Sequence, residues 1–204
     1  MVTLKTVVLD DEKCIGCITC MRRCPTEAIR IVNGKAKIQY EKCINCGECI
    51  RSCKGGAKRP VYDSFDLVKS YPYKIALPSP SLFGQFNHLD DPNYVIEGLL
   101  ALGFDEVFEV GLAAELVTDC SKKLIAEGKL PRPVISTACP AVVELILMKF
   151  HELADHMLEV YAPAKIAAKL AKKRAIERGI LADDIGIFFI SPCPAKVYSL
   201  HKEE

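Results

Sequence analysis

Two stretches of the chain share one arrangement of cysteines: CIGCITCMRRCP at residues 14–25 and CINCGECIRSCK at residues 43–54. In each stretch, three cysteines are separated by two residues and a fourth follows after three more. The second stretch repeats the first position by position, so that Cys43 corresponds to Cys14. Flanking residues recur too, as EKCIGC against EKCINC. The N-terminal part of the chain therefore contains an internal repeat.

The repeated spacing resembles the cysteine run of bacterial two-cluster ferredoxins. There, three cysteines hold corners of one [4Fe-4S] cluster, and the fourth ligates the other cluster. Structural zinc is the alternative, but zinc sites use pairs of C-x2-C knuckles separated by a longer spacer. A third and fourth cysteine in each run, with no histidine nearby, favour iron. The spacing predicts one cluster at Cys14, Cys17, Cys20 and Cys53, and a second at Cys43, Cys46, Cys49 and Cys24.

The composition suits a globular chain in a reducing compartment. The chain has 204 residues, 11 cysteines and a formal net charge of +1. Residues 1–60 hold 12 Lys and Arg against 6 Asp and Glu, which is a basic excess of +6. Nucleic acid is one explanation, but no aromatic residues are interleaved for stacking, whereas anionic cluster thiolates also attract basic residues. With no signal peptide and no apolar membrane span, we expect a cytoplasmic protein without membrane insertion or nucleic-acid binding.

The rest of the chain has a different pattern. Asn33-Gly34 predicts a β-hairpin over 28–40 inside the repeat, and residues 61–73 are interpreted as a linker. Beyond it, strands and helices alternate, which predicts a mostly parallel sheet with crossover helices. The expected strands are 74–78, 106–111, 133–139 and 184–191, with IFFI (187–190) central and buried on both faces. The predicted fold is an α+β ferredoxin-like two-cluster domain at 1–60, followed by an α/β domain at 74–204.

Three cysteines remain outside the repeat. Cys139 and Cys193 each follow an expected strand and precede a proline. Sites in open parallel sheets form beyond the carboxyl ends of the strands, where Pro78-Ser79 would lie as well. Cys120 falls in the middle of an expected helix and is interpreted as a packed thiol. The four histidines are interpreted as surface residues: His88, His151, His156 and His201.

The order of these features resembles the [FeFe]-hydrogenases, also called iron-only hydrogenases. In that family, ferredoxin-type clusters precede an α/β domain with the H-cluster, a [4Fe-4S] unit linked to a di-iron centre. ISTACPA (135–141) resembles the family's first cluster motif, Thr-Ser-Cys-Cys-Pro, and SPCPAK (191–196) its second, Met-Pro-Cys-x-x-Lys. GFDEVFEVGLAAEL (103–116) resembles the segment upstream of the first motif, and ALPS (76–79) resembles the turn that lines the di-iron pocket.

The resemblance implies roles for particular residues. Cys139 and Cys193 would ligate the cubane part of the H-cluster, and Lys196 would donate to a cyanide ligand of the di-iron unit. Pro78 and Ser79 would line the pocket. The chain departs from the family at Ala138, where the family has a proton-relaying cysteine. Cys120 and Ser121 stand where the family has acidic relay residues, and the family's third motif, with two more cysteines, lies beyond residue 204.

Because of these departures, we do not expect the chain alone to turn over hydrogen. The alanine in place of the relay cysteine resembles the sensory branch of the family. The sequence thus predicts an electron-transfer protein with two [4Fe-4S] clusters, fused to a partial H-cluster domain of the hydrogen- or redox-sensing type. The alternatives are a fragment of an active ferredoxin-linked hydrogenase, and a plain carrier with an apo docking domain. Expected partners are a ferredoxin or a reductase, with a regulatory domain or partner chain completing the α/β domain and its H-cluster.

Overall fold

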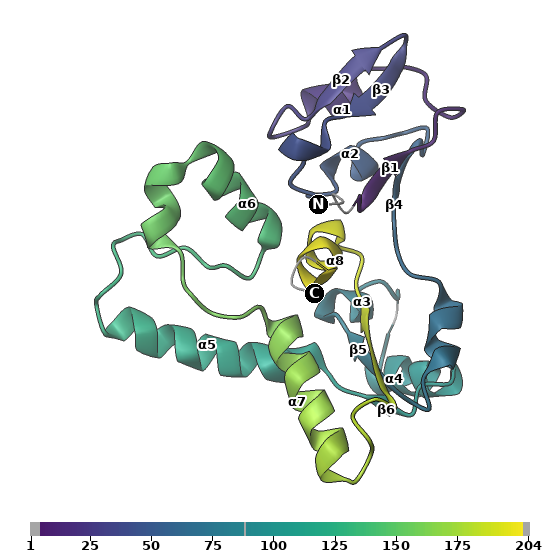
Figure 1. Ribbon diagram of the computed structural model, residues 1–204, viewed down its shortest axis with the longest axis vertical. Helices are drawn as coiled ribbons and strands as arrows, with labels where there is room; N and C mark the ends of the chain where they lie inside the picture. The colour runs from purple at the N-terminus through teal and green to yellow at the C-terminus, as the bar shows by residue number, and fades with distance from the viewer. Residues whose placement is uncertain (1–4, 88, 202–204) are drawn as a thin grey trace. The chain divides into compact units, whose positions relative to one another are not determined.

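The computed structural model describes residues 5–87 and 89–201 (Figure 1), so the expectation for His88 lies outside the described residues. The chain divides into two compact units. The repeat unit joins Met1–Tyr62 to Cys139–Met157 and Cys193–Glu204. The sheet unit consists of Asp63–Ala138 and Leu158–Pro192. The segments 139–157 and 193–204 therefore belong with the cysteine repeat.

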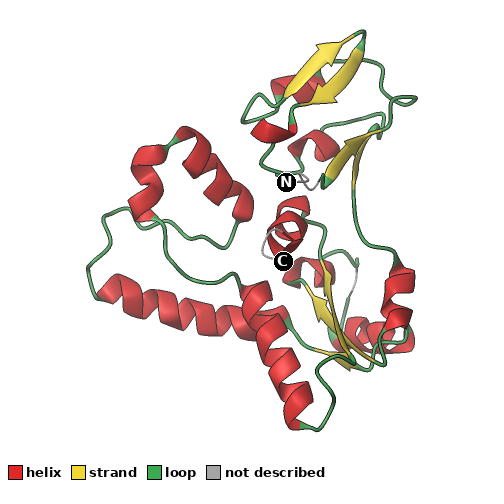
Figure 2. Cartoon of the chain, viewed as in Figure 1, coloured by secondary structure: helices red, strands yellow, loops and turns green. Residues whose placement is uncertain are grey.

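The repeat unit is built from short elements, drawn in Figure 2 as two separate strand pairs with small helices. Strand β1 pairs antiparallel with β4, and β2 pairs antiparallel with β3. Each cysteine run ends in a short helix, and a strand follows it, as the repeat predicts. The elements are β1 (Val7–Leu9), α1 (Thr19–Arg22), β2 (Ile29–Val32), β3 (Lys35–Ile38), η1 (Tyr40–Lys42), α2 (Glu48–Arg51), β4 (Lys58–Pro60), α6 (Pro140–Lys149), η3 (His151–His156) and α8 (Pro194–His201).

The β2–β3 hairpin confirms the turn predicted at Asn33-Gly34. Both turn residues have positive φ, 52° and 71°, which a two-residue type I′ turn requires. Ile29 on β2 and Ala36 on β3 are buried in one apolar cluster with Cys14, Cys20 and Ala57. The hairpin thus forms one side of the core that surrounds the cysteines.

The repeat extends to the backbone conformation. Three left-handed positions in the first copy have left-handed partners at the equivalent positions of the second, and these pairs are Gly16 and Asn45, Ile18 and Gly47, and Glu27 and Gly56. Glycine and asparagine adopt this conformation readily, whereas a β-branched residue such as Ile18 does so only under strain. The two cysteine loops therefore follow the same path, and the first copy holds that path with a less suitable residue.

The sheet unit contains one parallel sheet with strand order β6-β5-β7. Ile75 and Leu77 of β5 face a cluster with α5 and α7, whereas Ala76 between them faces a cluster with α4. Helices therefore cover both faces, as a parallel sheet requires. The elements are η2 (Phe65–Ser70), β5 (Tyr73–Pro78), α3 (Pro80–Phe83), α4 (Asn93–Ala101), β6 (Glu106–Val107), α5 (Val110–Ala126), α7 (Pro163–Glu177) and β7 (Ile185–Ile190).

Two expectations about this sheet are wrong. The central strand is β5, and β7 with its IFFI run pairs only on one side among the described residues. The segment 133–139 forms no strand of the sheet. Its Ile135 carbonyl instead accepts from the Leu158 N–H at 2.8 Å, and the Thr137 hydroxyl donates to the Leu158 carbonyl at 2.7 Å. An apolar run predicts burial but does not specify which neighbour supplies the hydrogen bonds.

Candidate metal centres

The eight repeat cysteines gather in the repeat unit with graded exposure. Cys14 and Cys20 are buried, Cys17 and Cys46 are exposed, and Cys24, Cys43, Cys49 and Cys53 are half-buried. The buried pair packs against the hairpin through Ile29 and Ala36. A mixture of buried and exposed thiols around one core is suited to ligating a cofactor at the edge of a small domain.

The thiols form two predicted ligand groups, and they interact both within each group and between the groups, since Cys20 also raises the pKa of Cys49. Burial raises the pKa of Cys20, and the neighbouring thiols of Cys17, Cys53 and Cys14 raise it further. Burial also raises the pKa of Cys43, and Cys46 and Cys24 add to that rise. Cys53 therefore lies near thiols of the first run, and Cys24 lies near Cys43 and Cys46 of the second. In the crossed ligand assignment, the fourth cysteine of each run ligates the cluster held by the other run, which requires this arrangement. The assignment itself stays a prediction.

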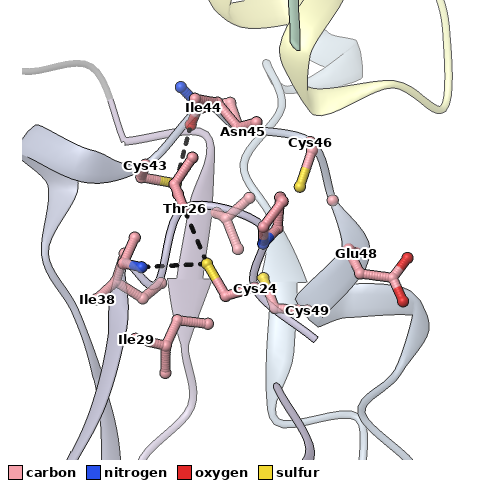
Figure 3. Close-up of a pocket in the computed structure, with 14 residues that line it drawn as sticks. Cys24, Thr26, Ile29, Ile38, Cys43, Ile44, Asn45, Cys46, Glu48 and Cys49 are labelled. Atoms are coloured by element: carbon pink, nitrogen blue, oxygen red, sulfur yellow. Dashed lines mark hydrogen bonds between the residues drawn. The ribbon is translucent and has the colours of Figure 1, made fainter. Parts of the chain in front are cut away.

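The second group lines a pocket (Figure 3). The sulfurs of Cys24, Cys43, Cys46 and Cys49 lie around it, with Ile29, Ile38 and Ile44 on its apolar walls. Burial raises the pKa of Cys49 from its ordinary 9.0 to about 12. The apolar walls of this pocket limit the access of water to a bound cluster and thereby affect its potential.

Backbone amides donate to the sulfur atoms in the same way in both copies. The Ala28 N–H donates to Cys24 Sγ at 3.2 Å, and the Ala57 N–H donates to Cys53 Sγ at 3.3 Å. Each amide belongs to the residue four positions after the cysteine. Such donors stabilise a thiolate and tune a cluster that it ligates.

The donor set of the repeat consists of eight thiols, which are the ligands of iron–sulfur clusters. Among residues 5–87 and 89–201, no three His, Cys, Asp or Glu side chains converge closely enough to hold one metal ion. Four sulfurs on one zinc ion would lie about 4 Å apart, given a Zn–S bond of about 2.3 Å. A cubane holds its ligands farther apart because a separate iron atom binds each sulfur.

Lys58 is a site residue that the sequence interpretation overlooked. It lies in β4, its side chain is buried, and its ammonium has no hydrogen-bond partner among the described residues. A buried ammonium without a partner is costly, and a negatively charged cofactor would supply the missing counter-charge. The repeat itself contained the signal, because Lys58 occupies the position of the apolar Ile29 in the first copy.

Cys139 and Cys193 belong to the repeat unit together with Lys196. Cys139 is exposed and precedes the first residue of α6, and Cys193 is half-buried and directly precedes α8. Both begin a Cys-Pro-Ala sequence, and the two alanines, Ala141 and Ala195, are buried in one cluster with Ile44. Both cysteines thus lie in one unit, each directly before the first residue of a helix. The strand expected before Cys139 is absent.

The other sequence-predicted residues lie elsewhere. Pro78 and Ser79 lie at the end of β5 in the sheet unit, where both are buried and the Ser79 N–H donates to the Ile190 carbonyl at 2.9 Å. Cys120 on α5 is exposed, so its interpretation as a packed thiol is wrong. A helix period places residues on a face but does not show which face is covered.

The described histidines differ in exposure. His151 and His201 are exposed, as expected, whereas His156 is half-buried.

No helix in the described part of the chain is both long enough and apolar enough to cross a membrane.

Comparison with protein families adds two matches. Residues 73–204 match the C-terminal domain of the iron-only hydrogenase large subunit, and residues 6–54 match a 4Fe-4S dicluster domain. The second match covers all eight repeat cysteines, which identifies the repeat as an iron–sulfur region.

Among individual proteins, the periplasmic [Fe] hydrogenase large subunit of Nitratidesulfovibrio vulgaris is 27% identical over 217 residues, covering 96% of this chain and 51% of that protein. The NADP-reducing hydrogenase subunit HndD of Solidesulfovibrio fructosivorans is 25% identical over 116 residues, covering 52% of this chain and 20% of that protein. The chain thus spans about half of the first relative and a fifth of the second.

A solved structure from a study of [FeFe]-hydrogenase inactivation by oxygen aligns with a TM-score of 0.47 and 21% identity, covering 67% of this chain and 38% of that one. The family match over residues 73–204 covers well over half of the sequence. The chain therefore belongs to the iron-only hydrogenase large subunit family.

Proposed function

We propose that this chain transfers electrons through two [4Fe-4S] clusters to a third iron–sulfur centre that Cys139 and Cys193 hold in part. The first cluster would bind Cys14, Cys17, Cys20 and Cys53, and the second would bind Cys43, Cys46, Cys49 and Cys24. When bound, such clusters accept and release single electrons. In domain terms we propose a two-cluster domain at 1–60, a linker at 61–73 and a partial H-cluster domain at 74–204.

The observation that carries this proposal is the burial of Ile44 in one apolar cluster with Ala141 and Ala195. Ile44 lies in the second cysteine run, between Cys43 and Cys46. Each alanine lies two residues after one of the cysteines of the proposed third centre. This packing supports a route in which the second cluster is the neighbour of the third centre.

The third centre is incomplete within these residues. A cubane takes about four protein ligands, and Cys139 and Cys193 provide two. We propose that further sequence or a partner chain supplies the rest. Lys196, in the first turn of α8, is half-buried in the same unit as both cysteines. Its ammonium would donate to an anionic ligand there.

Anaerobic reconstitution followed by iron analysis tests the proposal. Two cubanes require about eight irons per chain, and a third would raise the content to about 12. We expect about eight irons, electron transfer to an added ferredoxin, and no hydrogen evolution from a reduced dye. An iron content near one or two per chain would contradict the two-cluster proposal. Robust hydrogen evolution by the isolated chain would favour the alternative of an active hydrogenase fragment.

A hydrogen- or redox-sensing role is the second candidate, and Ala138 favours it. In the family, a cysteine at this position relays protons, and a methyl group cannot. The Ala138 N–H donates to the Ser136 hydroxyl at 3.3 Å, so the nearby polar side chain is used as a hydrogen-bond acceptor. In the protein with its ligand set completed, Ala138→Cys should raise hydrogen evolution about 100-fold. An unchanged rate would count against a lost proton relay as the reason for slow turnover.

A further inference from the structure

Lys58 combines features that rarely occur together. Its side chain is 3% exposed, and its ammonium has no hydrogen-bond partner among the described residues. Its backbone is held in β4 opposite Leu9 of β1. Lysine is almost never fully buried without a partner, because the charge loses its hydration. The position therefore requires a negative charge nearby.

The repeat shows that this charge is not needed for the fold of the loop. Ile29 is the counterpart of Lys58 in the first copy, is 2% exposed, and packs against Cys14, Cys20 and Ala36. The residues just before the two positions, Ala28 and Ala57, make equivalent N–H bonds to Cys24 and Cys53. The two side chains thus occupy equivalent places beside a fourth cysteine. One copy fills that place with a hydrocarbon, and the other fills it with an ammonium.

Lys58 lies near cysteines of both groups. Its neighbour Ala57 is buried in one cluster with Cys14 and Cys20, and strand β4 contacts helix α2, which contains Cys49. Burial raises the pKa values of Cys20 and Cys49, and the charge of Lys58 opposes that rise at both. It also opposes the rise in the pKa of Cys43, where it ranks behind the other causes. Cys20 belongs to the first proposed ligand set, whereas Cys43 and Cys49 belong to the second. Because the site is buried, salt screens these interactions little.

We propose that Lys58 is a shared counter-charge that raises the reduction potentials of both clusters. This inference rests on the proposed function. Each cluster gains one negative charge when it takes one electron from an external reductant such as dithionite. The positive charge of Lys58 stabilises the more negative state. The hydrocarbon at position 29 has no such effect, so the second copy of the repeat supplies the charge for both clusters.

The test is an EPR-monitored potentiometric titration of the reconstituted full chain. Lys58→Met removes the charge at similar length, and Lys58→Ile places there the residue that the repeat already accommodates at position 29. We expect the equilibrium constant for one-electron reduction of each cluster to fall at least tenfold. This corresponds to a fall of about 59 mV or more in each reduction potential. Lys58→Arg should keep them close to wild type. Lys54→Met is the matched control, because Lys54 is exposed and its loss should matter little.

Each outcome bears on the inference. Full iron content with unchanged potentials in Lys58→Met and Lys58→Ile overturns it and leaves the proposed function intact. A wild-type chain that binds fewer than about eight irons removes the proposed function, and the inference with it. If the uncharged variants lose iron while Lys58→Arg keeps it, the positive charge is needed for the oxidised clusters to bind, and this supports the counter-charge role. Iron loss in all three variants would show that side-chain shape matters at position 58, and the inference would be wrong.

Discussion

Gly47 lies against Pro194: a Cβ atom on Gly47 would approach Cγ and Cδ of the proline ring to 3.3 Å. Gly47 belongs to the second cysteine run, and Pro194 follows Cys193 and begins α8. This contact and the burial of Ile44 beside Ala141 and Ala195 attach the second cysteine loop to both Cys-Pro-Ala segments. Residues far apart in sequence therefore share one packed region.

Gly47→Ala should destabilise this region. Gly47 has φ 75°, so alanine carries a backbone cost of about 1–2 kcal/mol, and the added methyl also presses on Pro194. Gly56→Ala is the matched control, since Gly56 has φ 62° and open space where the methyl group of alanine would lie. We expect the visible absorbance of the clusters to be lost at a lower urea concentration in Gly47→Ala than in Gly56→Ala. Equal midpoints would indicate that the Pro194 contact contributes nothing in solution.

Position 16 requires glycine for a steric reason, and this reason does not apply at the equivalent position of the second copy. A Cβ on Gly16 would overlap the carbonyl oxygen of Gly34, although the equivalent residue in the second copy is Asn45. Gly16→Asn should therefore cost about 3 kcal/mol by overpacking, even though asparagine tolerates a left-handed backbone. Gly34→Asn, with φ 71° and open space, should cost about 1 kcal/mol or less. Urea titrations followed by circular dichroism compare the two, and a small loss for Gly16→Asn would contradict the overlap.

Pairs of cysteine variants test the crossed ligand assignment. Cys53→Ser should remove one cluster, lowering the iron content from about eight to about four. Adding Cys14→Ser should cause no further loss, because both residues would serve the same cluster. Adding Cys43→Ser instead should remove the remaining iron. Cys120→Ser, at an exposed position of α5, is the control and should keep all the iron. Further iron loss on adding Cys14→Ser would mean that Cys53 serves another cluster.

The iron-free chain should lose stability at alkaline pH. Burial raises the pKa of Cys49 from 9.0 to about 12, so the folded chain favours the neutral thiol. That contribution is complete below pH 9.0 and is lost as the pH rises toward about 12. Urea midpoints measured across this window should therefore fall, and Cys49→Ser should weaken the fall. The same protonation opposes metal binding, so iron uptake by wild type should improve as the pH rises from neutral. Urea midpoints for the wild-type chain that are constant over this window would contradict the expectation.

Local sequence signals were sufficient where the structure depends on neighbours in the chain. The hairpin follows from Asn33-Gly34, since few residues accept two successive positive φ values. The cysteine loops follow from their spacing, which repeats along with the backbone conformation. The sequence predicts helices over 93–102, 113–127 and 164–178, and α4, α5 and α7 lie close to these ranges, because several turns of periodic apolar residues define them.

Long-range packing determined the rest. IFFI was expected at the centre of the sheet, but β5 occupies that position, because apolar character does not specify strand order. The run before Cys139 hydrogen-bonds to Leu158 and joins no sheet strand. The burial of Lys58, the exposure of Cys120 and the grouping of Cys139 with Cys193 are also tertiary properties.

The sequence by itself determined the chemistry of this protein: eight cysteines at iron–sulfur spacing, repeated once, and two Cys-Pro-Ala segments that resemble hydrogenase motifs. The tertiary structure alone decided which thiols are neighbours, which lysine lies buried among them, and which helices pack on the second loop. The physical reason is that spacing and propensity act over a few residues, whereas burial and electrostatic environment depend on contacts between segments distant in the chain.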